Sequence, residues 1–376
     1  MNIKNILLTG GRAPVTLDLA RKFNELGMNV FVAESFQHNV TKSSNAIKKA
    51  FLIPKPNQET ERFIDTLIDI IQREKIDFFI PTCEEIFYIS KYKHQIDPYC
   101  QVFVDDIEKL KLLHSKWEFI NFLKEIEVDF PTTVKVESHR ELVEASKGKI
   151  VVIKPVYSRF STNTFILNTK EITPYINVSP ANPYVVQEYI DGTQYCSYSI
   201  VHQGVIKAHT VYKTTFTAGR GATIAFEHTD HKGIFQIVKK IVEKLRFTGQ
   251  IAFDFIEDKT GHIYPIECNP RATSGIHLLI ESKIHEAFFN QSEKMILPRT
   301  NERKMIALAM LLYSLSSKNK TWLKTFLTSK DISFRKNDIK PFFYQFVSMY
   351  HLWKIARKEK LSILESSTFD IEWGGE

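Results

Sequence analysis

Two neighbouring stretches decide the fold: GQIAFDFIED at residues 249–258 and IYPIECNPR at residues 263–271. Both are strongly apolar around their acidic residues, and a short segment, Lys259–Gly261, separates them. Two such runs joined by a glycine-containing turn are typical of a β-hairpin. We therefore expect two antiparallel strands here, each carrying acids inside an otherwise apolar sequence.

Four polar residues of this hairpin belong together. Because residues two apart on a strand point to the same face, Glu267 and Asn269 are neighbours, and Arg271 continues their row. The number of residues between Asp254 and Glu267 suits a position for Asp254 on the first strand, facing Glu267 across the turn. Two carboxylates and an amide oxygen are hard ligands of the kind that Mg²⁺ takes, while phosphate and water complete its shell.

The alternative is that the two acids lie on the polar face of a half-exposed sheet. However, Asp254 and Glu267 are embedded in apolar strands, where burying a charge without a counter-ion costs free energy. Buried acids are normally paired or bound to a metal. We therefore interpret Asp254, Glu267 and Asn269 as a metal site.

Lys154 is a second unusual residue, in the run VVIKPV at residues 151–156. A lysine inside a β-branched run has no packing role there. It either reaches solvent from an edge strand or holds phosphate oxygens, for which a compact cation is suited. The hairpin strengthens the phosphate interpretation of Lys154.

In their order along the chain, these residues resemble the ATP-grasp superfamily. The matching positions are Lys116, Lys154-Pro155, Gln187-Glu188-Tyr189-Ile190 with Gly192, Asp254, and Glu267-x-Asn269-x-Arg271. The best likeness is to the branch with biotin carboxylase, carbamoyl-phosphate synthetase and amino-acid ligases, and it covers about residues 1–300. The E-x-N-x-R motif after an apolar strand is fairly specific, whereas K-P alone is not.

The resemblance implies that ATP is the cofactor. Lys116 and Lys154 would hold its α- and β-phosphates, and the segment from Gln187 to Ile190 would be the hinge between two grasping subdomains. The implied adenine contacts are Glu188 and the backbone of Tyr189 and Ile190.

The resemblance also implies where the phosphoryl transfer takes place. Asp254, Glu267 and Asn269 would bind Mg²⁺ (or Mn²⁺), and Arg271 would face the transferred phosphoryl group and the acyl phosphate. Phosphoryl transfer is catalysed mainly by positioning and charge neutralisation. The lack of a Ser/His/Asp or Cys/His arrangement is therefore expected.

Two positions depart from the family's pattern. The loop at residues 156–163 is usually glycine-rich, so that its backbone covers the phosphates, but here it contains no glycine. The acid that often contacts the ribose is replaced by Gln194. We keep Gln194 as a nucleotide-binding candidate, and nucleotide orientation can differ from the family's.

Other polar residues indicate where the substrate binds. Arg220 lies between two glycines on a flexible turn, where a guanidinium suits a carboxylate or phosphate, and the resemblance places this region beside the acceptor. We count Arg220 with Arg271 and Lys154 as catalytic candidates, although an exposed loop arginine is an equally good interpretation. Glu84 and Glu85 follow a predicted strand, where they either touch an amine or serve a helix N-terminus.

The N-terminal region alternates between strand and helix patterns, which favours a small parallel sheet. Gly10-Gly11 after the first strand suggests a dinucleotide fold, but the three-glycine fingerprint is incomplete. We therefore interpret Glu34, at the end of the next strand, as an ordinary surface acid.

We expect an α/β and α+β architecture. Residues 1–108 would form a Rossmann-like domain, 109–186 and 187–300 the two ATP-grasp subdomains, and 301–376 a mostly helical segment. For that last, aromatic-rich segment the favoured interpretation is a helical cap on the core.

Composition narrows the classes of partner. The formal charge of +7 is scattered rather than concentrated, which argues against nucleic acid. No apolar run is long enough for a secretory signal or a membrane span, so we expect a cytoplasmic protein without a membrane partner. Four widely spaced cysteines indicate neither disulfides nor zinc. These features do not determine whether the chain forms a homo-oligomer.

The leading hypothesis is an ATP-dependent, ADP-forming carboxylate–amine ligase. The carboxylate would be activated as an acyl phosphate and attacked by an amine, with amino acids as candidate substrates. A bicarbonate-activating enzyme resembling biotin carboxylase or carbamoyl-phosphate synthetase is the second hypothesis. A nucleotide-binding module that has lost catalysis is the third hypothesis. The glycine-free loop favours it, whereas the presence of Asp254, Glu267, Asn269 and Arg271 argues against it.

Overall fold

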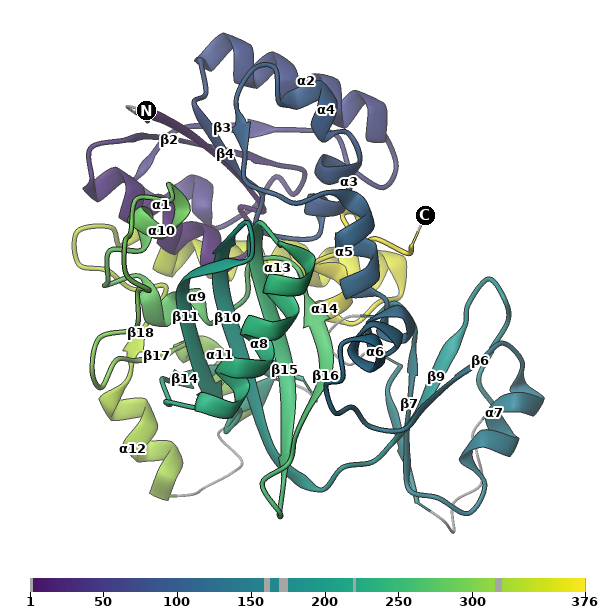
Figure 1. Cartoon of the computed structure of the whole chain (residues 1–376). Helices are drawn as coiled ribbons and strands as arrows, with labels where there is room; N and C mark the ends of the chain where they lie inside the picture. Colours follow the sequence, from purple (N-terminus) through teal and green to yellow (C-terminus); the bar gives the residue numbers. More distant parts are fainter. Residues whose placement is uncertain (1–2, 159–162, 169–174, 219–220, 315–319, 376) are drawn as a thin grey trace.

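The N-terminal part of the chain forms a parallel sheet (Figure 1), and the computed structural model describes residues 3–158, 163–168, 175–218, 221–314 and 320–375. The strand order is β3-β2-β1-β4-β5, and every neighbouring pair is parallel. The strands are β1 (Asn5–Thr9), β2 (Asn29–Glu34), β3 (Ile47–Leu52), β4 (Phe78–Ile80) and β5 (Gln101–Val102). The helical elements are α1 (Pro14–Glu25), η1 (Thr41–Ser43), α2 (Thr60–Glu74), α3 (Glu85–Lys91) and α4 (Lys93–Ile96). The predicted strand–helix alternation is confirmed.

The glycine that ends β1 is explained by packing. Gly10 has a φ of +71°, in the left-handed region that favours glycine. A Cβ atom at Gly10 would also lie 2.4 Å from the hydroxyl oxygen of Thr82, in the loop after β4. The Gly10-Gly11 pair therefore serves a close contact between neighbouring strand ends.

Two short helices connect this sheet to the next. They are α5 (Ile107–His114) and α6 (Lys116–Glu125), separated at Ser115, whose hydroxyl accepts a hydrogen bond from the Glu118 N–H at 3.2 Å. An antiparallel sheet follows in the order β6-β9-β7-β8. Its strands are β6 (Thr133–Val136), β7 (Val151–Pro155), β8 (Phe165–Leu167) and β9 (Tyr184–Glu188), with helix α7 (His139–Ser146).

A second antiparallel sheet has the order β11-β10-β15-β16. Its strands are β10 (Gly192–His202), β11 (Val205–Lys213), β15 (Gly249–Asp258) and β16 (Ile263–Asn269). Helix α8 (Lys232–Leu245) covers one face, where Val238 and Ile241 are buried with Phe253 and Phe255 (Figure 1). Because side chains alternate along a strand, the side chain of Asp254 points to the other face of β15.

Shorter elements extend this part of the chain. They are β12 (Thr217–Ala218), β13 (Ala222–Thr223), β14 (Ala225–Glu227), α9 (Ile276–Leu279) and α10 (Ile284–Phe288). The C-terminal segment contains β17 (Arg303–Met305), α11 (Ala307–Tyr313), α12 (Lys320–Thr328), β18 (Lys330–Asp331), α13 (Lys340–Glu359) and α14 (Ile363–Ser366). The segment is mostly helical, as predicted, but β17 pairs with β14 and β18 and so joins it to a small sheet.

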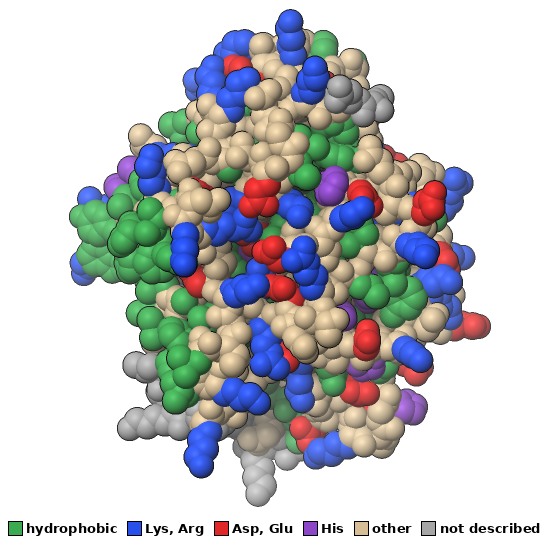
Figure 2. All heavy atoms as spheres, turned by 90° about the vertical axis from the view of Figure 1, so that its left-hand side faces the viewer, with side chains coloured by type: hydrophobic (Ala, Val, Ile, Leu, Met, Phe, Trp, Pro, Cys, Tyr) green, Lys and Arg blue, Asp and Glu red, His purple; other side chains and the backbone are tan. Residues whose placement is uncertain are grey.

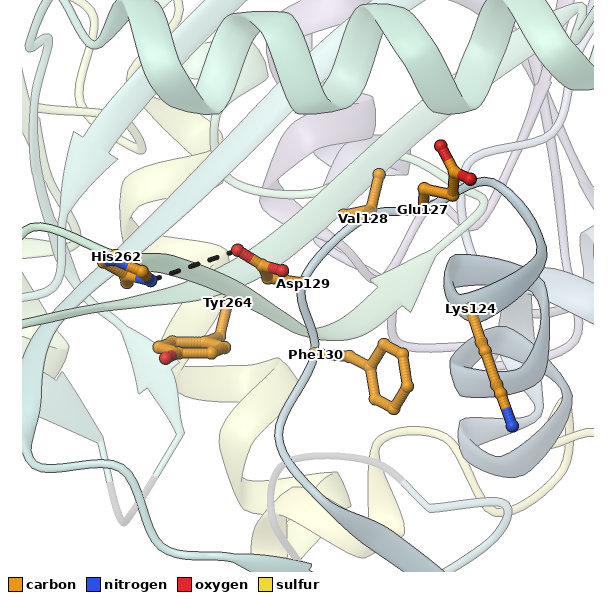
Figure 3. A pocket seen from close by; sticks show the side chains of 7 residues that line it. All are labelled: Lys124, Glu127, Val128, Asp129, Phe130, His262 and Tyr264. Carbon is orange, nitrogen blue, oxygen red and sulfur yellow. Dashed lines mark ion pairs between the residues drawn. The ribbon is translucent and has the colours of Figure 1, made fainter.

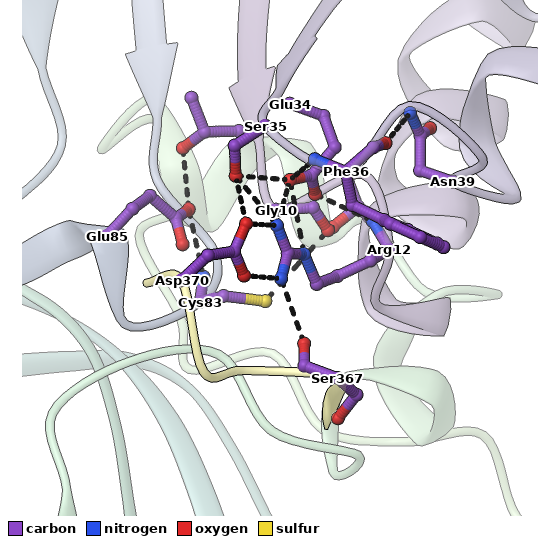
Figure 4. A network of polar contacts seen from close by, with 12 residues as sticks. Gly10, Arg12, Glu34, Ser35, Phe36, Asn39, Cys83, Glu85, Ser367 and Asp370 are labelled. Atoms are coloured by element: carbon purple, nitrogen blue, oxygen red, sulfur yellow. Dashed lines mark hydrogen bonds and ion pairs between the residues drawn. The ribbon is translucent and has the colours of Figure 1, made fainter. Parts of the chain in front are cut away.

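The end of the chain returns to the N-terminal sheet, where a buried ion cluster holds it (Figure 4). We call Arg12, Glu34, Ser35, Ser367 and Asp370 the Arg12 cluster. The guanidinium of Arg12 lies 2.5 Å from both Glu34 and Asp370, and it donates to the Ser35 hydroxyl at 2.7 Å and the Ser367 carbonyl at 3.0 Å. The interpretation of Glu34 as a surface acid is wrong, because its side chain is buried. Its negative charge is neutralised there by the guanidinium of Arg12.

Candidate active site

The hairpin has the register that the sequence indicates. Asp254 on β15 faces Glu267 on β16, and Ala252 faces Asn269. An irregularity in the register follows Asp254. The two carboxylates therefore lie on one face of the sheet, opposite to the face on which Phe253 and Phe255 pack.

The predicted residues of the nucleotide site, except Lys116, line one cavity of ≈ 380 Å³ between the two antiparallel sheets. That volume is within the range of small-molecule sites. The predicted residues in its wall are Lys154, Gln187, Glu188, Tyr189, Ile190, Gln194, Asp254, Glu267, Asn269 and Arg271. The structure thus brings together residues that are more than a hundred positions apart in the sequence.

Lys154 is buried within its sheet, because β7 is flanked by β8 and β9. Its ammonium donates hydrogen bonds to the Gln187 side-chain oxygen at 3.0 Å and to the Ile266 carbonyl at 3.2 Å. Burial lowers the pKa of Lys154 to about 8, although the carboxylate of Glu267 opposes this. The edge-strand alternative is therefore wrong, and Lys154 is a desolvated cation on the cavity wall.

Lys116 approaches the same site from the first turn of α6. Its side chain is buried, its ammonium lies 3.7 Å from a carboxylate oxygen of Glu267, and it donates to the Ser158 carbonyl at 3.2 Å. A cation at a helix N-terminus opposes the helix dipole. The position of Lys116 therefore does not serve the stability of α6, whereas its contact with Glu267 joins it to the site.

The end of β9 supplies the segment predicted as the hinge. The Gln187 amide donates to the hydroxyl of Thr133 at 3.0 Å, which orients its oxygen toward Lys154. A carboxylate oxygen of Glu188 accepts from the Thr132 N–H at 3.3 Å. The Tyr189 N–H donates to the Ile150 carbonyl at 3.2 Å, so this N–H is paired within the protein.

The acids and Arg271 form a dense charge cluster. Burial, and after it the negative charge of Glu267, raises the pKa of Asp254 to about 6. Arg271 donates to the side-chain oxygen of Asn269 at 3.0 Å and lies 3.6 Å from Glu84, in the loop after β4. Glu84 therefore connects the N-terminal sheet to this site.

The donor set fits a hard divalent cation. Within the described residues, no group of three or more His, Cys, Asp or Glu side chains forms a metal site. Asp254 and Glu267 instead combine two carboxylates with the amide of Asn269. Such a set leaves coordination positions for phosphate oxygens and water, as Mg²⁺ requires.

Sequence reasoning did not identify every residue that lines the cavity. Cys196, Thr214 and Thr223 also line the cavity, and the Cys196 sulfur lies 3.5 Å from the Thr214 hydroxyl oxygen. Burial raises the pKa of the Cys196 thiol, which makes it an inert wall residue. The period-two alternation of β10 carries the signal, because Cys196 follows Gln194 on the same face.

Two predictions concern residues whose structure is not described. Arg220, the candidate for the acceptor side, lies outside the described residues, as do residues 159–162 of the glycine-free loop. The role of Arg220 stays a prediction. Glu85, by contrast, is buried and accepts hydrogen bonds from the Thr9 hydroxyl at 2.7 Å and the Cys83 N–H at 3.1 Å, so it supports the loop after β4.

A second concavity, of ≈ 400 Å³, lies between α6, the loop that follows it and the β15–β16 turn (Figure 3). Its wall contains Lys124, Glu127, Val128, Asp129, Phe130, His262 and Tyr264. The His262 ring nitrogen and the Asp129 carboxylate are 4.0 Å apart, and both side chains are largely exposed. Because solvent screens such a pair, it supplies little binding energy. None of the predicted site residues lines this concavity.

Comparison with known proteins finds a family model that matches part of the chain and solved structures with a similar fold. Residues 113–275 match the model of the ATP-grasp domain. L-amino acid ligase from Bacillus licheniformis superposes with a TM-score of 0.62 at 14% identity, over 78% of this chain and 77% of that one. N5-carboxyaminoimidazole synthetase from Staphylococcus aureus, complexed with ADP, gives 0.64 at 13% identity, over 90% and 91%.

A third similar structure comes from Hydrogenobacter thermophilus. The biotin carboxylase domain of its 2-oxoglutarate carboxylase, in complex with MgADP, ADP and bicarbonate, gives a TM-score of 0.61 at 12% identity, over 79% of this chain and 71% of that one. At these identities the likeness shows the fold. The predicted resemblance is confirmed.

Proposed function

We propose that the protein is an ADP-forming ligase that joins a carboxylate to an amine with ATP and Mg²⁺, starting from the match of residues 113–275 to the model of the ATP-grasp domain. The observation that carries the proposal is the single cavity in which Lys154, the end of β9, Asp254 and Glu267 meet. In this cavity Lys154 would bind phosphate, the end of β9 would contact adenine, and the two acids would bind a divalent ion. The substrates of the similar proteins, an amino acid among them, support the carboxylate–amine class.

The residues divide the proposed reaction between them. Lys154 and Lys116 would hold the phosphates, and Arg271 would face the transferred group. Bound Mg²⁺ would offset the negative charge of the phosphate oxygens. A carboxylate oxygen of the substrate attacks the γ-phosphorus and ADP leaves. The amine nitrogen then attacks the acyl carbon, phosphate leaves, and the nitrogen releases a proton.

The proposal is tested by measuring ADP release by the full-length protein with ATP and Mg²⁺ and a panel of amino acids, added singly and in pairs. We expect release that depends on amino acids and stops when Mg²⁺ is omitted, with an amide product detected by mass spectrometry. Release that depends on bicarbonate alone would contradict the carboxylate–amine assignment. Nucleotide binding without turnover under every condition would contradict the ligase itself.

Lys154→Met is expected to weaken nucleotide binding without unfolding the protein. A hydrogen bond to a charged group contributes about 1.5–3 kcal/mol, so the affinity for a non-hydrolysable ATP analogue should fall about 10- to 100-fold. The substitution removes the desolvated charge but leaves the Gln187 and Ile266 oxygens without this donor, so the free energy of unfolding should fall by no more than about 1–3 kcal/mol. Isothermal titration calorimetry and urea unfolding measure the two quantities separately.

Lys304→Met is the matched control. Lys304 is as buried as Lys154, but it lies 3.2 Å from Glu302 and 3.3 Å from Glu281, and it does not line the cavity. Its loss removes the nearer cation from Glu302, which keeps Lys330 at 3.7 Å, and the cation from Glu281, so this variant should lose stability and keep its nucleotide affinity. Equal affinity of Lys154→Met and the unmodified protein would contradict the phosphate role of Lys154.

A further inference from the structure

Helix α13 presents an apolar stripe to solvent. Phe343, Phe346, Val347, Tyr350 and Trp353 are between 41% and 59% exposed. Their spacing of three and four residues places them along one side of the helix. In Figure 1 α13 lies behind the sheets, and Figure 2, which turns that rear side to the left, shows hydrophobic side chains projecting at that edge. Exposed apolar patches of this kind mark interaction surfaces.

The opposite side of α13 is fixed to the protein. Ser348 and Ala356 are buried, and the ring of His351 stacks on His38 with a centroid distance of 3.4 Å. The Tyr344 hydroxyl also lies 3.5 Å from a ring nitrogen of His38. The stripe is therefore the outer face of a docked helix. We call Phe343, Phe346, Val347, Tyr350 and Trp353 the α13 stripe.

Cations continue the α13 stripe at its C-terminal end. The ammonium of Lys354 lies 4.6 Å from the ring centre of Tyr350, and the guanidinium of Arg357 lies 4.9 Å from that of Trp353. Further exposed lysines at both ends of the helix are Lys336, Lys340, Lys358 and Lys360. Helix α13 contains one acid, Glu359, so the stripe lies in a strongly basic setting.

We propose that the α13 stripe docks onto the surface of an anionic lipid bilayer. Aromatic side chains that insert among headgroups, beside Lys and Arg that pair with anionic lipids, are the two parts of an interfacial helix. Charge favours this occupant over a second copy of the chain. Two such faces packed on each other would bring many cations together, with only Glu359 of each α13 helix to offset them.

Docking of this kind needs no membrane-spanning segment. None of the helices in the described part of the chain has the length and apolar character to cross a bilayer. The expectation of no membrane partner rested on the lack of such a span. Binding at the bilayer surface through one aromatic stripe and its cations is a different mode of contact, and it requires no such span.

The test is co-sedimentation of the full-length protein with vesicles. One set is phosphatidylcholine alone and the other is phosphatidylcholine and phosphatidylglycerol in equal parts, at low and high salt. We expect binding to the anionic set only, and weaker binding at high salt. Each cation near an anionic surface contributes about fivefold, so Lys354→Gln/Arg357→Gln should bind about 30-fold more weakly. Tyr350→Ser/Trp353→Ser should also lose binding.

The control is Lys239→Gln/Lys244→Gln, which removes the same charge from exposed positions of α8, on the side of the molecule away from α13 (Figure 1). It should bind as the unmodified protein does. No binding to anionic vesicles, equal binding to both sets, or equal loss in the control would overturn the proposal. So would a dimer, measured by sedimentation velocity, that Tyr350→Ser/Trp353→Ser dissolves, because the occupant would then be a second copy.

Discussion

Replacing Glu267 with glutamine is expected to abolish turnover, with a loss of at least about 10³-fold, while the fold stays intact. Glutamine keeps the shape of the side chain but removes its charge. That charge faces Asp254 across the hairpin and lies 3.7 Å from Lys116, so its loss weakens the proposed metal site and removes the acid beside the cation that we propose to bind phosphate. ADP release measures turnover, and circular dichroism with thermal unfolding shows whether the fold stays intact.

The matched control is Glu257→Gln. Glu257 belongs to the same hairpin, pairs with Ile263 and contacts His231 at 3.5 Å, but it does not line the cavity. This variant should keep its turnover within about threefold, because Glu257 does not line the cavity and a change of about 0.7 kcal/mol corresponds to that factor. Full activity of Glu267→Gln would remove the metal assignment.

Arg12→Met should cause the largest loss of stability. Removing one partner of a buried ion pair typically costs about 3–5 kcal/mol, because the other charge stays buried without a counter-ion. Here two acids, Glu34 and Asp370, would lose their shared cation. Urea unfolding should report the loss, and limited proteolysis should detach the C-terminal segment that Asp370 anchors.

The loss should depend on pH. Burial alone would raise the pKa of Asp370, but the guanidinium of Arg12 outweighs it and holds that pKa below its ordinary value of 3.8. A carboxylate with a lowered pKa stabilises the fold fully above its ordinary pKa, and this contribution disappears as the pH falls through the lowered value. The stability difference between the unmodified protein and Arg12→Met should therefore be full at pH 7 and shrink below pH 3.8.

An exposed arginine gives the control for Arg12→Met. Arg62, in the first turn of α2, lies 2.7 Å from Glu59 on the protein surface, so Arg62→Met should change the free energy of unfolding by less than about 1 kcal/mol. If Arg12→Met cost no more than Arg62→Met, the Arg12 cluster would not hold the chain end in place.

The sequence predicted those parts of the protein that short-range patterns determine. Strand alternation and the spacing of Asp254 and Glu267 indicated the hairpin register, and the β-branched run around Lys154 indicated a strand. These signals work because side-chain direction follows directly from position along a strand. The roles of the site residues in binding and catalysis stay predictions.

What the sequence did not reveal depends on contacts between distant segments. Glu34 was taken for a surface acid because its partners, Arg12 and above all Asp370, lie far from it along the chain. No periodic pattern relates residue 34 to residue 370. The contact of Glu84 with Arg271 likewise joins two sheets whose relative placement only the folded chain fixes.

The most direct test is a crystal structure of the full-length protein with Mn²⁺ and a non-hydrolysable ATP analogue. We predict an anomalous difference peak between the carboxylates of Asp254 and Glu267, phosphate oxygens near Lys154, and adenine beside residues 187–190. A manganese peak or a nucleotide bound elsewhere, with the cavity between the two sheets filled only by water, would contradict the account.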